Sequence, residues 1–201
     1  MPETTLLATE TNPIRIRVGY PWSPPNGSRR VPARSDKRWQ CIRGWVKSAA
    51  DTVGASIGKR KPASTSFQVD ISRLRGTHGR LLLGDLMRRI RTADIILLDL
   101  GARGSLSFNQ NVLLEAGMAL AFAAETSKCV FILKPKLLDL PSDLQGYLVT
   151  DYRQNAGSES LLLEDPNGFH AALRSAVSQA AASRGMVGAR GRAFLRDESD
   201  V

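Results

Sequence analysis

Short apolar stretches alternate with longer amphipathic stretches along most of the chain. Apolar residues alternate with basic ones over 14–18 and with polar ones over 67–71, which predicts two strands. The segments 94–100 and 129–133 have unbroken apolar centres, which is typical of strands buried on both faces of a parallel sheet. A short fifth strand is expected near 147–149.

Helical patterns separate and follow these strands. Apolar residues recur at helical spacing over 37–54 and 81–92, and a third helix is expected over 111–124. An Ala-rich amphipathic segment over 167–183 predicts a fourth helix that covers one face of the sheet. The alternation predicts an α/β fold, a three-layer sandwich with a mostly parallel five-stranded sheet.

The chain has 201 residues, which fit a single domain expected over 13–183. A flexible N-terminus is expected over 1–12, a basic loop insertion at about 21–37 and a flexible tail over 184–201. Ligands of parallel α/β sheets bind beyond the carboxyl ends of the strands. The candidate site is therefore expected in the loops that begin at Gly19, Ser72, Leu100 and Lys134.

The positive charge is concentrated near the start of the chain. The formal net charge is +9, and residues 1–66 contain most of the basic excess. Basic clusters over 29–38 and 59–61 predict attraction to the phosphates of nucleic acid or of a nucleotide, or else are solvated loops. Few aromatic residues are interleaved with these clusters, so nucleic acid is not the favoured partner.

Several classes of protein are excluded by what the sequence lacks. The two cysteines, Cys41 and Cys129, lie in unrelated contexts, which favours buried thiols over a disulfide or a metal site. No metal-ligand spacing and no phosphate-binding glycine motif occurs, so neither a metal nor a cofactor is expected. No apolar run approaches the roughly 18 residues of a membrane span and no secretory signal pattern occurs, so we expect a cytoplasmic protein without a membrane partner.

The third predicted helix contains a single charged residue among apolar ones. The segment 112–124 is apolar except for Glu115, and a helix that is apolar all round is expected to be buried. Burying an unpaired carboxylate costs several kcal/mol or raises its pKa. Glu115 is therefore expected either to pair with an arginine of the loop over 73–79 or to line a ligand cavity. Helical spacing places it on one side with Val112, Met118, Ala119 and Phe122.

A lone buried carboxylate suits a particular chemistry. It can attack a sugar carbon as a nucleophile or stabilise an oxocarbenium-like centre. Enzymes that hydrolyse O-glycosides usually need a second carboxylate to protonate the leaving oxygen. The N-glycosidic bond to nicotinamide already has a positive leaving group, so one carboxylate suffices there.

Three blocks of the sequence resemble a known family. RTADIILLDL (91–100), FNQNVLLEAGMALAF (108–122) and LPSDLQGYLVTDY (140–152) resemble the bacterial TIR-like nucleotide-binding domains, with a match over about 67–153 and a flavodoxin/TIR-like sheet. The layout is also similar to nucleoside 2-deoxyribosyltransferases, because GYPW at 19–22 resembles the turn after their first strand. Both families cleave a base from C1 of a ribose with one glutamate, so both resemblances imply that Glu115 is catalytic.

The resemblance and the loop positions together give a set of candidate substrate contacts. The two aromatic residues of this set stack on a base or nicotinamide ring or belong to the core. The two asparagines bond ribose hydroxyls or cap a helix. The aspartate orients Glu115 or a ribose hydroxyl, or forms a turn, and the arginine holds a pyrophosphate or a neighbouring protomer. The set is Gly19, Tyr20, Trp22, Arg73, Asp99, Asn109 and Asn111.

The function that the resemblance implies is hydrolysis of NAD+ with release of nicotinamide through Glu115, in bacterial anti-phage defence. NAD+ is then a substrate rather than a cofactor, and a homo-oligomer with a nucleotide activator is expected. The alternatives are a nucleoside 2-deoxyribosyltransferase or nucleoside hydrolase, and a non-catalytic module that binds a nucleotide or a signalling partner.

Overall fold

The computed structural model describes residues 13–21, 36–58, 67–74, 82–102, 107–126, 128–140, 144, 147–154 and 160–185. The strands of this part are β1 (Ile14–Gly19), β2 (Val69–Arg73), β3 (Ile95–Asp99), β4 (Cys129–Pro135), β5 (Leu148–Gln154) and β6 (Leu161–Leu163). The helices are α1 (Lys37–Gly58), α2 (Leu82–Thr92), α3 (Gln110–Glu125) and α4 (Pro166–Ser183). The predicted N-terminus over 1–12, the predicted tail over 184–201 except for its first two residues, and nearly all of the predicted insertion at about 21–37 lie outside the described residues.

The sheet confirms the predicted fold class and corrects its strand number. Its order is β2-β1-β3-β4-β5-β6, with parallel pairing from β2 to β5 and β6 antiparallel to β5. The prediction of five strands was wrong because β6 has three residues, which is too short to give a recognisable alternation. β3 is buried along its whole length, as its unbroken apolar sequence predicts.

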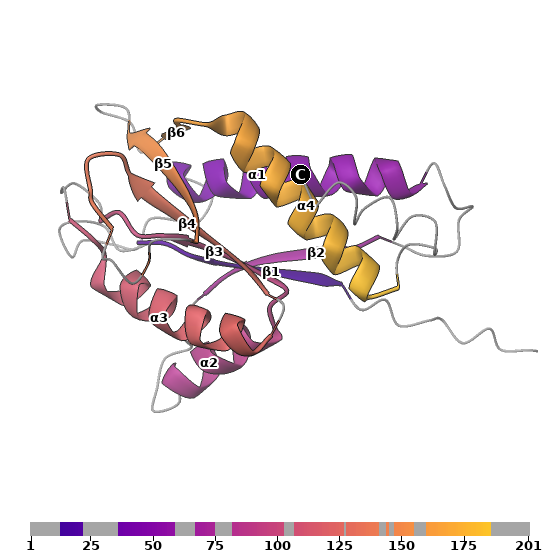
Figure 1. Ribbon diagram of the computed structural model, residues 1–201, viewed down its shortest axis with the longest axis horizontal. Helices are drawn as coiled ribbons and strands as arrows, with labels where there is room; N and C mark the ends of the chain where they lie inside the picture. Colours follow the sequence, from indigo (N-terminus) through magenta and orange to yellow (C-terminus); the bar gives the residue numbers. More distant parts are fainter. Residues whose placement is uncertain are drawn as a thin grey trace, which may run out of the picture.

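Helices cover both faces of the sheet and enclose two apolar cores (Figure 1). α1 and α4 pack on one face, where Ile14, Ile16 and Val18 of β1 join the core. α2 and α3 pack on the other face, where Ile96 and Leu98 of β3 meet α3. The two faces of a strand alternate residue by residue, so each core receives every second side chain.

β1 is unlike its neighbours on the face that meets α2 and α3. The residues of β1 that point to this face are Arg15, Arg17 and Gly19. Arg17 is buried and its Nη1 donates a hydrogen bond to Oδ2 of Asp70 at 2.9 Å. Gly19 has no side chain, so another group can approach the end of β1 closely. The candidate site lies at this position.

α3 is not buried all round, contrary to the expectation from its composition. Val112 and Ala119 are buried as predicted, whereas Leu114 is 60% exposed and Gly117 is also exposed. The reason is the position of α3 in an outer layer, where only one side of a helix can meet the sheet. Glu115 itself is half-buried.

Candidate functional site

The carboxyl ends of β1 and β3 lie side by side in the middle of the sheet. β1 ends at Gly19 and β3 ends at Asp99. The chain runs from β1 through α1 outward to β2, and from β3 through α3 in the other direction to β4. In parallel α/β sheets, ligands bind where the connections that follow two neighbouring strands leave in opposite directions. The structure therefore places Gly19, at the end of β1, where a ligand is expected to bind.

Glu115 lies in the second turn of α3 and its carboxyl group reaches the end of β1. A Cβ atom on Gly19 would overlap Oε2 of Glu115 and lie 2.8 Å from Cδ2 of Leu98. Glycine is thus the residue that fits beside this carboxyl group. Oε2 is buried and has no hydrogen-bond partner among the described residues. Burial accordingly raises the pKa of Glu115 from 4.5 to about 8.

The sequence leaves two interpretations of Glu115, an ion pair or a cavity. Within the described residues Glu115 forms no ion pair. The rest of the loop over 73–79, from Arg75 onward, lies outside the described residues. A buried carboxyl group without a partner is costly to the fold. Groups of this kind, placed at a ligand-binding edge, are candidates for catalysis.

A second cluster lies where β1 and β2 end and α1 begins. Tyr20 is buried, and its hydroxyl donates a hydrogen bond to Oδ2 of Asp36 at 2.9 Å. Its ring stacks on Trp39, with the ring centroids 5.8 Å apart. The guanidinium of Arg73 lies over both rings, 5.1 Å from the centroid of Tyr20 and 4.7 Å from that of Trp39. The predicted residues Tyr20 and Arg73 are thus brought together, and Asp36 and Trp39 join them.

Asp99 belongs to a different, fully buried network. The hydroxyl of Tyr152 donates to Oδ1 of Asp99 at 2.8 Å, and Nε of Arg38 lies 3.3 Å from Oδ2. Nη1 of Arg38 donates to the carbonyl of Gly101 at 2.8 Å. Burial, and then the charge of Asp99, raise the pKa of Tyr152. The network joins the start of α1 to the ends of β3 and β5, and substrate contact by Asp99 stays a prediction.

The two predicted asparagines differ in their positions. Asn109 is the N-cap of α3, because its Oδ1 accepts a hydrogen bond from the backbone N–H of Val112 at 3.1 Å. Asn111 lies exposed in the first turn of the same helix. The capping interpretation is therefore confirmed for Asn109, and ribose binding by Asn111 stays a prediction. Trp22 lies outside the described residues.

The described residues contain no group of three or more His, Cys, Asp and Glu side chains that could hold a metal ion. Among the helices described, none is both long enough and apolar enough to cross a membrane. At the carboxyl edge, the described residues place the carboxyl group of Glu115 beside Gly19, and a cation over two aromatic rings at the neighbouring strand.

Comparison with known proteins gives limited similarity. No protein-family model matches the chain, and no curated protein sequence matches it. Among solved structures, the chain is similar to a 2-desoxiribosyltransferase from Leishmania mexicana, with a TM-score of 0.34 and 16% sequence identity. The similarity covers 75% of this chain and 79% of that chain. A similarity of this degree carries no argument about activity, so the function is argued from the site.

Proposed function

We propose that this protein cleaves the N-glycosidic bond between a base and C1′ of a nucleoside, with Glu115 as the nucleophile. The observation that carries the proposal is the buried Oε2 of Glu115, which has no described hydrogen-bond partner and lies against Gly19 at the carboxyl edge. A carboxylate held without partners loses little solvation when it bonds to a carbon or faces a cationic transition state.

The reaction has two steps. An oxygen of the ionised Glu115 attacks C1′ while the bond from C1′ to the base breaks, and the base leaves with the electron pair and takes up a proton. Water then attacks C1′ and releases the sugar, or a second base attacks and forms a new nucleoside. In both cases the carboxylate is regenerated. Nucleoside hydrolysis and deoxyribosyl transfer therefore share one intermediate.

NAD+ is the second candidate substrate, because its nicotinamide leaves without needing a proton. One observation favours it. Two other buried carboxylates of the described chain, Asp36 and Asp99, are engaged by Tyr20 and by Arg38 with Tyr152. Neither carboxylate is therefore available to protonate a neutral base as it leaves. The anti-phage role, the homo-oligomer and the nucleotide activator remain predictions from the resemblance.

The test is release of base, followed by chromatography. The purified protein, its Glu115→Gln variant and a matched Glu164→Gln variant are each incubated with deoxynucleosides and, separately, with NAD+. Glu164 is a suitable control because it follows β6, which β3, β4 and β5 separate from β1 in the sheet, and because it pairs with Lys136 and Arg153.

We expect free base from deoxynucleosides with the unmodified protein and with Glu164→Gln, and a loss of at least about 100-fold with Glu115→Gln. Nicotinamide released from NAD+ alone would select the second candidate. Equal activity of Glu115→Gln and the unmodified protein would refute the role of Glu115. Binding of nucleotide without any release of base would favour the non-catalytic module.

A further inference from the structure

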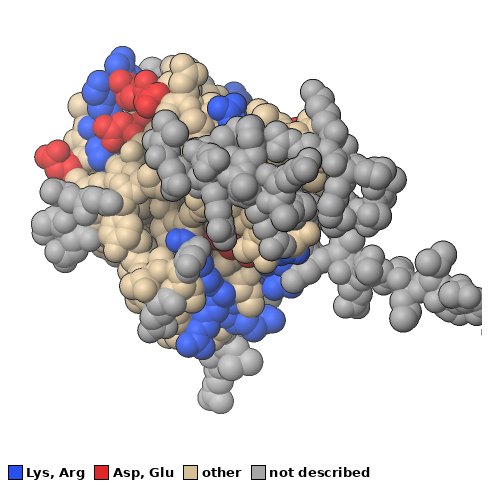
Figure 2. Space-filling view, turned by 45° about the vertical axis from the view of Figure 1, so that its right-hand side comes forward, with Lys and Arg blue, Asp and Glu red and all other residues tan. Residues whose placement is uncertain are grey.

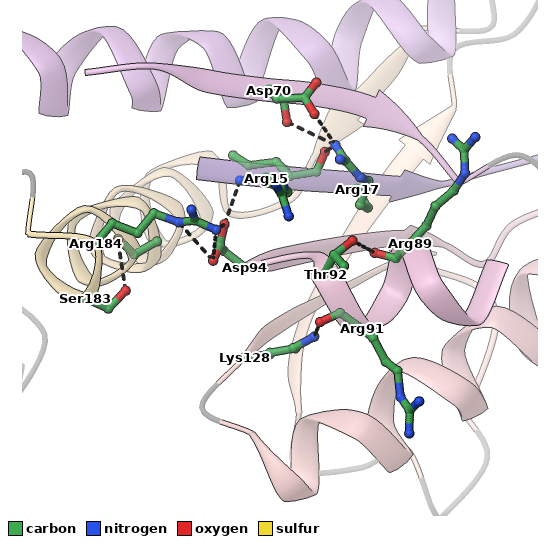
Figure 3. Close-up of polar contacts among 12 residues, drawn as sticks. Arg15, Arg17, Asp70, Arg89, Arg91, Thr92, Asp94, Lys128, Ser183 and Arg184 are labelled. Atoms are coloured by element: carbon green, nitrogen blue, oxygen red, sulfur yellow. Dashed lines mark hydrogen bonds and ion pairs between the residues drawn. The ribbon is translucent and has the colours of Figure 1, made fainter. Parts of the chain in front are cut away.

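A group of basic side chains lies at the amino ends of the strands, opposite the edge that carries Glu115. Figure 2 shows Lys and Arg side chains gathered on the lower part of this face, below the sheet, where Figure 1 places α2. Figure 3 shows basic side chains of this region, which come from β1, from α2, from the residue before β4 and from the residue after α4. We name this group the strand-start patch; it consists of Arg15, Arg17, Arg89, Arg91, Lys128 and Arg184.

The carboxylates near the patch are already bound to some of its cations. Asp94 accepts two hydrogen bonds from Nη2 of Arg184, at 2.7 and 2.8 Å. Arg17 pairs with Asp70 at 2.9 Å, and Nε of Arg89 pairs with Asp85 at 2.9 Å. Each of these three carboxylates is therefore matched by an arginine of the patch.

The other three cations have no carboxylate partner among the described residues. The guanidinium of Arg15 makes no hydrogen bond or ion pair with a described residue, although its backbone N–H donates to Asp94. Arg91 is exposed and lies over the ring of Phe122, 4.8 Å from its centroid. Nζ of Lys128 donates to the carbonyls of Ile90 and Arg91.

Lys128 lies beside another cation of the patch, because its Nζ donates to the backbone carbonyl of Arg91. Burial lowers the pKa of Lys128; the charge of Asp94 counteracts this effect, and the charge of Arg91 adds to it. An anion placed between these side chains would relieve the repulsion between them. Most cations of the patch are arginines, whose planar guanidinium group matches the geometry of phosphate oxygens.

We infer that the strand-start patch binds the phosphate backbone of a nucleic-acid duplex, independently of base sequence. A duplex presents a regular, dense array of phosphates that can contact cations from several elements at once. Stacking of unpaired bases needs an open aromatic face, and the ring of Phe122 is half-buried with the guanidinium of Arg91 over it.

The same surface gives no reason to expect a membrane. The large apolar side chains that are exposed in the described chain are Leu83, Leu114, Leu137, Tyr147, Leu148 and Leu162, and none belongs to the patch. Binding to a lipid surface usually combines basic residues with apolar side chains that enter the interface. Backbone contacts to a duplex need only the cations.

The experiment measures the fluorescence anisotropy of a labelled DNA duplex of about 20 base pairs against protein concentration at several salt concentrations. Arg91→Gln and Arg15→Gln each remove one cation of the patch. Arg43→Gln and Arg174→Gln are matched controls, because each removes one exposed arginine from α1 or α4, on the opposite face of the sheet. Circular dichroism verifies that each variant is folded, and Arg91 is exposed, so its loss does not disturb the core.

We expect each patch variant to bind the duplex roughly five- to tenfold more weakly near 0.1 M salt and to reduce the salt slope by about one, with no such change in the controls. Equal weakening by controls and patch variants would attribute binding to net charge and overturn the inference. So would tighter binding of a single strand of the same sequence, stronger patch-dependent binding to anionic phospholipid vesicles, or no binding of duplex by the unmodified protein at low salt.

Discussion

Replacing Glu115 by glutamine is expected to change how the stability of the protein depends on pH. The pKa of Glu115 is 4.5 in an unfolded chain and is raised to about 8 in the folded protein by burial. Between these pH values the folded state holds a proton that the unfolded state has released. The stabilisation is complete below about pH 4.5 and is lost as the pH rises through about 8.

The size of the effect follows from the difference between the two pKa values. At about 1.36 kcal/mol per pH unit, and with allowance for partial contact with water, the loss amounts to roughly 3–5 kcal/mol. Glutamine carries no titratable proton, so Glu115→Gln avoids this loss. The difference in unfolding free energy between variant and unmodified protein should therefore move in favour of the variant by this amount from about pH 5 to about pH 9.

Urea unfolding at both pH values measures this difference directly, because other titrating groups are common to the two proteins. Glu164→Gln is the control. Hydrogen bonds from Arg153 and Lys136 lower the pKa of Glu164, so this carboxylate is ionised throughout the range and its removal adds no pH dependence. Parallel stability curves for Glu115→Gln and the unmodified protein would refute the argument that Glu115 is buried without a partner.

Three further predictions concern the same part of the molecule. Gly19→Ala should cost roughly 1–3 kcal/mol in urea unfolding through overlap with Glu115, whereas Gly44→Ala, with open space around it, should be neutral or stabilising; equal effects would contradict the close approach. Arg38→Met should cost roughly 3–5 kcal/mol by leaving the buried charge of Asp99 without its arginine, and adding Asp99→Asn should recover part of this loss; additive costs would show that the pair is not coupled. If base release needs ionised Glu115, kcat/KM should rise with pH to a plateau above about pH 8, and a falling profile would instead make Glu115 a proton donor.

The sequence predicts the layers of the fold well, because periodicity reports which faces of each element are buried. The central strand β3 is apolar without interruption, and its position in the sheet follows from that alone. The sequence does not predict β6, because three residues are too few to show a periodic pattern. It also does not predict the exposed side of α3. Composition indicates that a helix is apolar but not how much of it the rest of the chain covers.

The candidate site is predicted where one residue contradicts its surroundings. Glu115 is recognisable because it is a charge within an apolar helix. The network of Asp99 with Tyr152 and Arg38 is not, since its members are 53 and 114 positions apart in the sequence and each is ordinary in its own segment. Asp36 is missed for a related reason, because an aspartate just before a helix is typical of an N-cap, a role that it also has.

The polar side of β1 also bears on which part of the protein opens first. Arg15 and Arg17 face α2 and give it little apolar surface to cover, and Ile90 is the one fully buried side chain described in that helix. α4, on the opposite face, buries seven residues, among them Phe169 and Leu173. Local opening free energies follow the apolar surface that each element covers. Amide protons of α2 should therefore exchange with deuterium well before those of α4, so that the layer that α2 shares with α3 loosens at α2 while α4 stays closed.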